Sequence, residues 1–169
     1  MYRPEQLRPG DIILCEGVVD ARDPIGLMFV WASANPFQHA ALVGDGELLE
    51  AIDQVGTVPL DEYAPVGWRF EVAGASAEQR RAAVTAVRSR LGQPYGYRTL
   101  VAAGARIPFY KRLDPHDVVS SGLVSWAFGQ AGIQLSWEPL PSVASLSYSP
   151  LLLGPRPWLG GSPCRSRPC

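Results

Sequence analysis

The sequence has little of several features that would narrow its function at once. It holds only 2 histidines and 3 cysteines in 169 residues, and none of them has the spacing of a zinc site. The net charge of −1 gives no basic field to attract nucleic acid. The longest apolar run, residues 25–34, is too short to cross a bilayer. We therefore expect no metal, no cofactor, no nucleic-acid partner and no transmembrane segment.

The first residues also lack the apolar core of a secretory signal. This places the protein, as an expectation, in the cytoplasm, in a viral particle or in an exported assembly. The 47% hydrophobic and 18% charged residues are typical of one globular domain. We expect that domain to span residues 1–153. The remainder, residues 154–169, is rich in Pro, Gly and Arg and predicts a tail, or an arm that orders on a protein partner.

The three cysteines differ in their surroundings. Cys15 follows Ile12-Ile13-Leu14 and is predicted to be a buried apolar residue of a core strand. Cys164 and Cys169 lie in the tail. They could pair with each other, pair with a partner chain or stay reduced.

Alternating and periodic patterns predict an α+β fold. The expected strands cover residues 12–15, 39–43, 47–51, 56–60 and 68–72, and the expected helices cover 25–33, 76–91, 95–104, 117–132 and a single turn at 142–147. Ser76 and Gln79 have the spacing of a capping box at the start of the second helix. Its arginines, at positions 80, 81, 88 and 90, are expected to form a solvated face.

A hairpin signal sets up the first candidate site residues. Asp45-Gly46 lies between two apolar strands and favours a two-residue turn. With that turn, the strand residues His39 and Glu50 lie diagonally on the same face of the sheet. The Glu50 carboxylate can then hold the His39 ring. A three-residue turn would put the two side chains on opposite faces.

The predicted helix at 117–132 has a polar head and an apolar body. Asp117, Ser120 and Ser121 crowd its start. One interpretation is simple helix capping. The other is a nucleophile at Ser120, where the helix dipole and free N–H groups favour developing negative charge.

Together, Ser120, His39 and Glu50 have the residue types of a nucleophile, a base and the group that orients the base. Histidine alone at a strand start is usually structural, and Glu50 alone could point outward. The joint pattern favours hydrolase chemistry. His116, four residues before Ser120, is expected to lie in a surface loop.

Several segments in this order resemble the permuted NlpC/P60 superfamily, which is papain-like and includes relatives of the lecithin-retinol acyltransferases and the bacterial YiiX/YebB-like proteins. The matching segments are Arg8–Leu14, Phe37–Gly46, Leu48–Ala51, Gly92–Tyr97, Ser120–Val124 and Pro141–Leu151. The resemblance implies an antiparallel sheet packed against a helix that carries the nucleophile. It also implies His39 as general base, Glu50 as the group that orients it, and hydrolysis of amide bonds, with peptide bonds of cell-wall peptidoglycan as the expected substrate.

The main departure from the family pattern is at the nucleophile. The family has Cys-Ser-x-Leu-Val where this chain has Ser120-Ser121-Gly122-Leu123-Val124. A thiol at a helix start beside an imidazole ionises near neutral pH, whereas a serine hydroxyl is a far weaker acid. Ser120 could be an engineered replacement, a natural inactive form or a working nucleophile.

Two other function classes stay open. Ser120 and the C-terminal arm are consistent with a non-catalytic binding or structural subunit of a larger, possibly viral, assembly. The apolar stretch 25–31 would suit an acyltransferase or esterase acting on membrane lipids.

Overall fold

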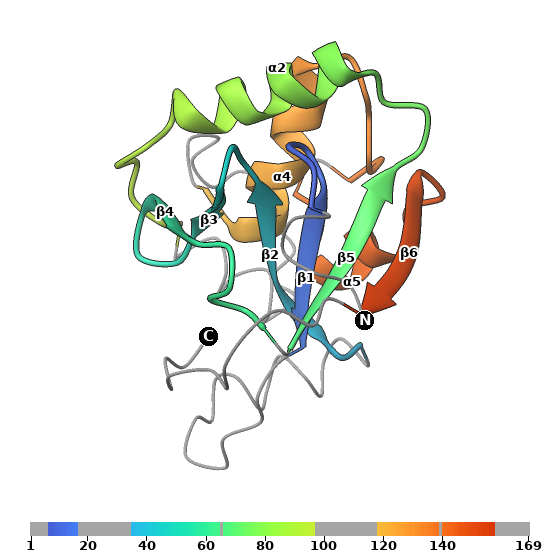
Figure 1. The fold of residues 1–169 in the computed structure, drawn as a ribbon, viewed down its shortest axis with the longest axis horizontal. Helices are drawn as coiled ribbons and strands as arrows, with labels where there is room; N and C mark the ends of the chain where they lie inside the picture. The colour runs from blue at the N-terminus through green and yellow to red at the C-terminus, as the bar shows by residue number, and fades with distance from the viewer. Residues whose placement is uncertain (1–6, 17–34, 65, 97–117, 139, 158–169) are drawn as a thin grey trace.

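The computed structural model describes residues 7–16, 35–64, 66–96, 118–138 and 140–157. Within these ranges one antiparallel sheet runs in the order β4-β3-β2-β1-β5-β6. Its strands are β1 (Ile12–Glu16), β2 (Phe37–Val43), β3 (Glu47–Ala51), β4 (Val55–Pro59), β5 (Gly67–Val72) and β6 (Leu152–Pro157). The helices are α2 (Ala77–Arg88), α4 (Ser120–Gln130) and α5 (Val143–Ser147). Figure 1 shows α2 across the top of the sheet and α4 behind β2 and β3. The α+β class predicted from the sequence is confirmed.

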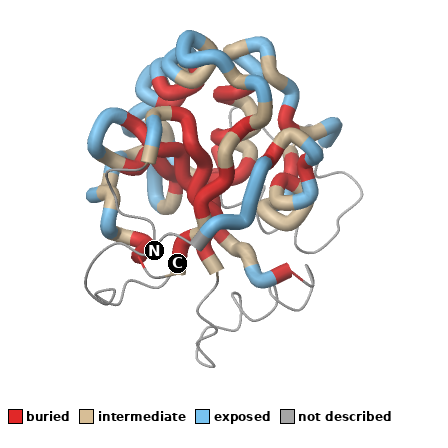
Figure 2. Tube along the Cα trace, turned by 45° about the vertical axis from the view of Figure 1, so that its right-hand side comes forward, coloured by how far each residue is buried: buried red, intermediate tan, exposed pale blue. Residues whose placement is uncertain are grey.

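The main core lies between the helices and one face of the sheet. Because strand side chains alternate, every second residue faces the helices. The sheet contributes Ile12, Leu14, Ala40, Leu42, Leu49, Ala51, Phe70 and Val72, and the helices contribute Ala83, Val84, Val87, Leu123, Val124, Ala127, Phe128 and Leu146. Figure 2 shows this buried centre as a continuous red region under more exposed helices.

The other face of the sheet carries a second, smaller apolar cluster. Its strand residues are Ile13, Cys15, Ala41, Val43 and Leu48, and the turn after β4 adds Tyr63 and Ala64. The central strand β1 is therefore covered on both sides, and its residues from Ile12 to Cys15 are fully buried. The predicted buried position of Cys15 is confirmed.

The predicted hairpin has the predicted register. Val43 pairs with Leu48, and the Gly44 N–H donates to the Glu47 carbonyl at 2.8 Å. Gly46 has a φ of 92°, a left-handed conformation that glycine adopts without strain. The two-residue turn is thus Asp45-Gly46, which is the condition on which the His39–Glu50 pairing depended.

Helix α2 begins where the sequence predicts, but two of the arginines expected on its solvated face make contacts within the protein. Ser76 and Gln79 form the capping box, with each side chain accepting from the backbone N–H of the other residue. The helix ends at Arg88, before the expected residue 91. Two arginines depart from the expected solvated face: the Arg90 guanidinium carbon lies 3.6 Å from the centre of the Trp126 ring, and Arg80 reaches the sheet.

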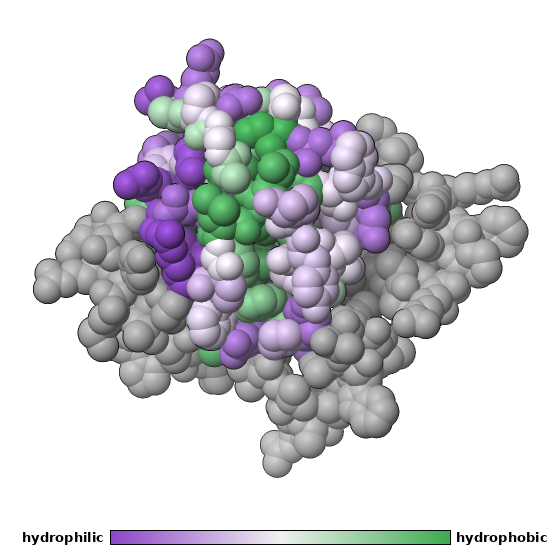
Figure 3. Space-filling view, turned by 90° about the vertical axis from the view of Figure 1, so that its right-hand side faces the viewer, coloured by the Kyte–Doolittle hydropathy of each residue, from purple (hydrophilic) through white to green (hydrophobic). Residues whose placement is uncertain are grey.

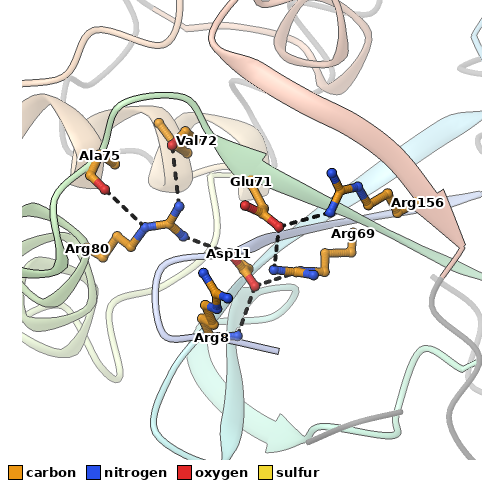
Figure 4. A network of polar contacts seen from close by, with 8 residues as sticks. All are labelled: Arg8, Asp11, Arg69, Glu71, Val72, Ala75, Arg80 and Arg156. Carbon is orange, nitrogen blue, oxygen red and sulfur yellow. Dashed lines mark hydrogen bonds and ion pairs between the residues drawn. The ribbon is translucent and has the colours of Figure 1, made fainter. Parts of the chain in front are cut away.

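Arg80 belongs to a buried network around Asp11, shown in Figure 4. Asp11 is fully buried and accepts hydrogen bonds from Arg80 Nη1 at 2.8 Å and Arg69 Nε at 2.7 Å. It also accepts from the backbone N–H of Arg8 at 2.9 Å. A buried carboxylate needs such partners. Arg80 supplies one because its long apolar stem extends from α2 and carries the guanidinium to Asp11.

The last strand continues past residue 153, where the sequence suggested the end of the domain. Residues 154–157 belong to β6, whose Val72–Leu152 and Trp68–Pro157 pairs join it to β5. Gly154 lies so close to β5 that an added Cβ would be 2.7 Å from Phe70 Cδ1. The Pro and Gly content that suggested a tail is compatible with an edge strand, because an edge strand needs hydrogen bonds on one side only.

Some expectations fall outside the described residues: the helix at 25–33, most of the helix at 95–104, His116, Cys164 and Cys169. Within the described ranges, no helix combines the length and the apolar character that crossing a membrane requires. On the side of the molecule that carries β6, Figure 3 shows a hydrophobic band between hydrophilic side chains.

Candidate functional site

His39 and Glu50 form a buried pair on β2 and β3. His39 Nε2 lies 2.9 Å from Glu50 Oε2, and the two residues are 7% and 5% exposed. A carboxylate has only acceptor sites, so the His39 Nε2–H donates and Nδ1 is left as the basic nitrogen. The contact that the sequence predicted from the turn is therefore present.

Tyr63 is a third member of this cluster, and sequence reasoning missed it. Its hydroxyl donates to Glu50 Oε2, the same oxygen that accepts from His39. Its ring centre lies 5.3 Å from that of His39, and the residue is 5% exposed. Tyr63 lies in the turn after β4, 13 residues from Glu50. No local pattern in the sequence predicts that this turn folds back over the sheet.

Ser120 is the first residue of α4 and is 4% exposed. The N-cap of the helix is Val119, which offers no capping side chain. Ser121 donates instead to the Pro141 carbonyl at 2.7 Å and so attaches the start of α4 to the segment before α5. Among the described residues, nothing forms a hydrogen bond with the Ser120 hydroxyl. The capping interpretation of these two serines is thus not what the structure shows.

The His39 ring and helix α4, which begins at Ser120, lie on opposite faces of the sheet. Helix α4 packs against the face of Ala40 and Leu42. The ring of His39 lies on the other face, where its neighbours are Glu50 and Tyr63. No hydrogen bond joins His39 to Ser120, both of which are described residues. The structure therefore brings His39 into contact with Glu50 and shows no bond from either to Ser120, and the role of Ser120 as a nucleophile stays a prediction.

Two further residues lie near the start of β2. Cys15 of β1 is the direct cross-strand partner of His39 and is fully buried. Gln38 precedes His39, and its side-chain Nε2 is buried and has no hydrogen-bond partner among the described residues. The register of β1 and β2 shifts between Cys15 and Glu16, at this same place. A bulge of this kind redirects side chains, and the sequence gives no sign of it.

Within the described residues, no group of three His, Cys, Asp or Glu side chains is placed so that it could hold a metal ion. In the His39 cluster, His39 Nε2 and the Tyr63 hydroxyl are both bonded to Glu50 Oε2. The cluster can therefore fix a ring and its tautomer, and it offers the His39 Nδ1 atom as a base.

No model of a known protein family matches the sequence, and no curated protein matches it. Among solved structures, the metalloprotein YiiX from Escherichia coli O157:H7 (DUF1105) is similar, with a TM-score of 0.68 and 16% sequence identity. The match covers 91% of this chain and 99% of YiiX. The chain described here thus shares the YiiX-like fold, an α+β arrangement around a six-stranded antiparallel sheet.

Proposed function

We propose that this chain is a non-hydrolytic protein of the permuted, papain-like NlpC/P60 type, which binds a peptide or a related amide ligand without cleaving it. One observation carries the proposal: Ser120 has no hydrogen bond to His39, and the His39 ring lies on the sheet face opposite α4. Nucleophilic hydrolysis by a hydroxyl requires a base within hydrogen-bond reach to remove its proton.

The ligand class is inferred from the fold and from the start of α4. The sequence resembles the NlpC/P60 superfamily, which implies an amide substrate, and a peptide carries carbonyl oxygens that first-turn N–H groups can bind. The expected natural ligand is a cell-wall peptide. A domain of this kind keeps the binding surface of a hydrolase while its chemistry is lost.

A second candidate is the hydrolase itself, with Ser120 at the nucleophile position, His39 as base and Glu50 orienting it. Two observations favour it: Glu50 fixes the His39 ring at 2.9 Å, and the Ser120 hydroxyl has no partner among the described residues. Its substrate would be an amide bond of peptidoglycan. Catalytic hydrogen bonds are often long before substrate binds, so this candidate needs an experiment.

The other partners suggested by the sequence stay predictions. An arm that docks on an assembly is limited to residues after 157, since 154–157 are part of β6. The apolar stretch that would meet lipid, residues 25–31, lies outside the described ranges.

Three proteins decide between the two candidates: this chain, Ser120→Cys and Ser120→Ala. Each is assayed for cleavage of peptidoglycan fragments and of a simple ester, and for binding of the same fragments by calorimetry. We expect no cleavage by any of the three and measurable binding by this chain. Cleavage by Ser120→Cys alone would identify a hydrolase that Ser120 has silenced. Cleavage by this chain that Ser120→Ala abolishes would identify Ser120 as a nucleophile, and absence of both cleavage and binding would contradict both candidates.

A further inference from the structure

A single oxygen of Glu50 accepts hydrogen bonds from two residues. His39 Nε2 lies 2.9 Å from Glu50 Oε2, and the Tyr63 hydroxyl donates to the same atom. The terminal torsion of a glutamate side chain has a broad preference, so one donor alone leaves the carboxylate able to turn. Two donors from different parts of the chain restrict that rotation. The orientation of Glu50 is therefore set by Tyr63 as well as by His39.

Tyr63 is itself held in place by contacts that do not involve Glu50. The residue is 5% exposed, and it packs with Ala64 in the smaller apolar cluster on this face of the sheet. Its carbonyl accepts from the Gly67 N–H at 2.7 Å, and the Ala64 N–H donates to the Asp61 carbonyl at 3.2 Å. Because burial and these backbone bonds hold the turn, the Tyr63 hydroxyl is a fixed point to which the Glu50 carboxylate is attached.

The tautomer of the His39 ring depends on this carboxylate. In a neutral imidazole one nitrogen carries the proton, and the hydrogen bonds of the ring decide which one. Here the acceptor at Nε2 selects the Nε2–H form and leaves Nδ1 unprotonated. If the carboxylate turned away, that selection would be lost. The Tyr63 ring adds a second restraint, because its centre lies 5.3 Å from the centre of the His39 ring.

The second donor to Glu50 is neutral, and this matters for the pair. Asp11, the other buried carboxylate among the described residues, is instead paired with two arginines. A guanidinium beside Glu50 would form a charge-assisted pair with it and compete with the imidazole for the negative charge. A phenol O–H fixes the carboxylate and leaves its charge available to His39.

We infer that Tyr63 is a positioning residue, which holds the Glu50 carboxylate and through it keeps the proton of the neutral His39 ring on Nε2. The inference goes beyond the proposed function, because both candidates need the same ring. A binding protein would use the unprotonated Nδ1 to accept from an amide N–H of its ligand, and a hydrolase would use it as the base. Tyr63 acts through Glu50 in either case.

The test follows the proton on His39 Nε2 by NMR in the isotope-labelled full chain, in mildly alkaline buffer where a histidine ring is ordinarily neutral. The sequence has 2 histidines, so His116→Gln identifies the His39 signals. Exchange of this proton with water requires the bond to Glu50 to open. We expect one tautomer in the unchanged chain, and an exchange rate at least about tenfold higher in Tyr63→Phe. The Nδ1–H tautomer should then become detectable.

The matched control is Ser76→Ala, which also destabilises the fold but removes an unrelated hydrogen bond, the cap of α2. It should leave the exchange rate of the ring proton unchanged. In Tyr63→Phe the faster exchange should not depend on urea below the unfolding transition, because a local opening exposes little surface. An unchanged ring proton in Tyr63→Phe would overturn the inference. Equal acceleration in Ser76→Ala, or a steep rise with urea, would do the same, because exchange would then occur through unfolding.

Discussion

The hydroxyl of Tyr63 donates a hydrogen bond to Glu50 Oε2 and so ties the turn after β4 to strand β3. Glu50 thereby has two donors for one buried oxygen, the second being the ring of His39. Removing either donor leaves a buried carboxylate less well paired, which is more costly than losing an exposed bond.

Tyr63→Phe tests this relationship. The change keeps the ring and removes only the hydroxyl, so we expect a loss of about 1 to 3 kcal/mol in the free energy of unfolding, measured with urea. Tyr148→Phe is the matched control, since Tyr148 is 74% exposed and should tolerate the change. Equal effects of the two substitutions would mean that the Glu50 contact adds nothing to stability.

Asp11→Asn should be far more damaging than a charge change on the surface. Asp11 is fully buried and pairs with Arg69, which is 3% exposed. Neutralising one partner leaves a buried positive charge, and such changes cost about 3 to 5 kcal/mol. Asp45→Asn, in an exposed pair with Arg88, should change the unfolding free energy by less than about 1 kcal/mol. Similar midpoints in thermal unfolding for both variants would contradict the central place given to Asp11.

Gly154→Ala and Gly129→Ala should shift stability in opposite directions. A Cβ at Gly154 would lie 2.7 Å from Phe70 Cδ1 and 2.9 Å from the Arg69 carbonyl oxygen, so β6 must move. At Gly129, inside α4, a Cβ meets nothing within 4 Å, and alanine should add about 0.5 to 1 kcal/mol through helix propensity. Thermal melts of the two variants and the unchanged chain provide the comparison. A tolerated Gly154→Ala would indicate that β6 is not held against β5 as described.

Ser76→Ala should destabilise α2 by about 1 kcal/mol, because it removes the hydroxyl that accepts from the Gln79 N–H. Gln79→Ala should have a smaller effect, since only the reciprocal bond to the Ser76 N–H is lost together with a contact to the Ala131 carbonyl. Adding both changes should cost less than the sum of the two, because the bonds form one capping unit. Chemical denaturation of the three variants measures this, and full additivity would argue against a shared cap.

The features that the sequence predicted are local ones. The Asp45-Gly46 turn fixes the register of β2 and β3, and the register alone brings His39 to Glu50. Ser76 and Gln79 are three residues apart and mark the start of α2 by themselves. In both cases residues close together in the sequence determine the interaction, so their types and spacing are enough to predict it.

The features that the sequence did not reveal depend on distant segments. Arg80 contacts Asp11 across 69 positions, and nothing in the helix pattern separates it from a solvated arginine. Tyr63 reaches Glu50 because a turn folds back over the sheet. The face against which α4 packs likewise depends on the whole sheet, and spacing could not show that the His39 ring lies on the other face.

The composition of β6 has a consequence for how copies of this protein meet. Pro155 and Pro157 occupy alternate positions in the last strand of the sheet and carry no N–H. β6 is an edge strand of the sheet. A strand from another molecule that paired with it would not receive backbone hydrogen bonds from Pro155 and Pro157. The same residues that resembled an unstructured tail in the sequence therefore discourage the sheet from growing into a neighbour, and so oppose self-association through that border.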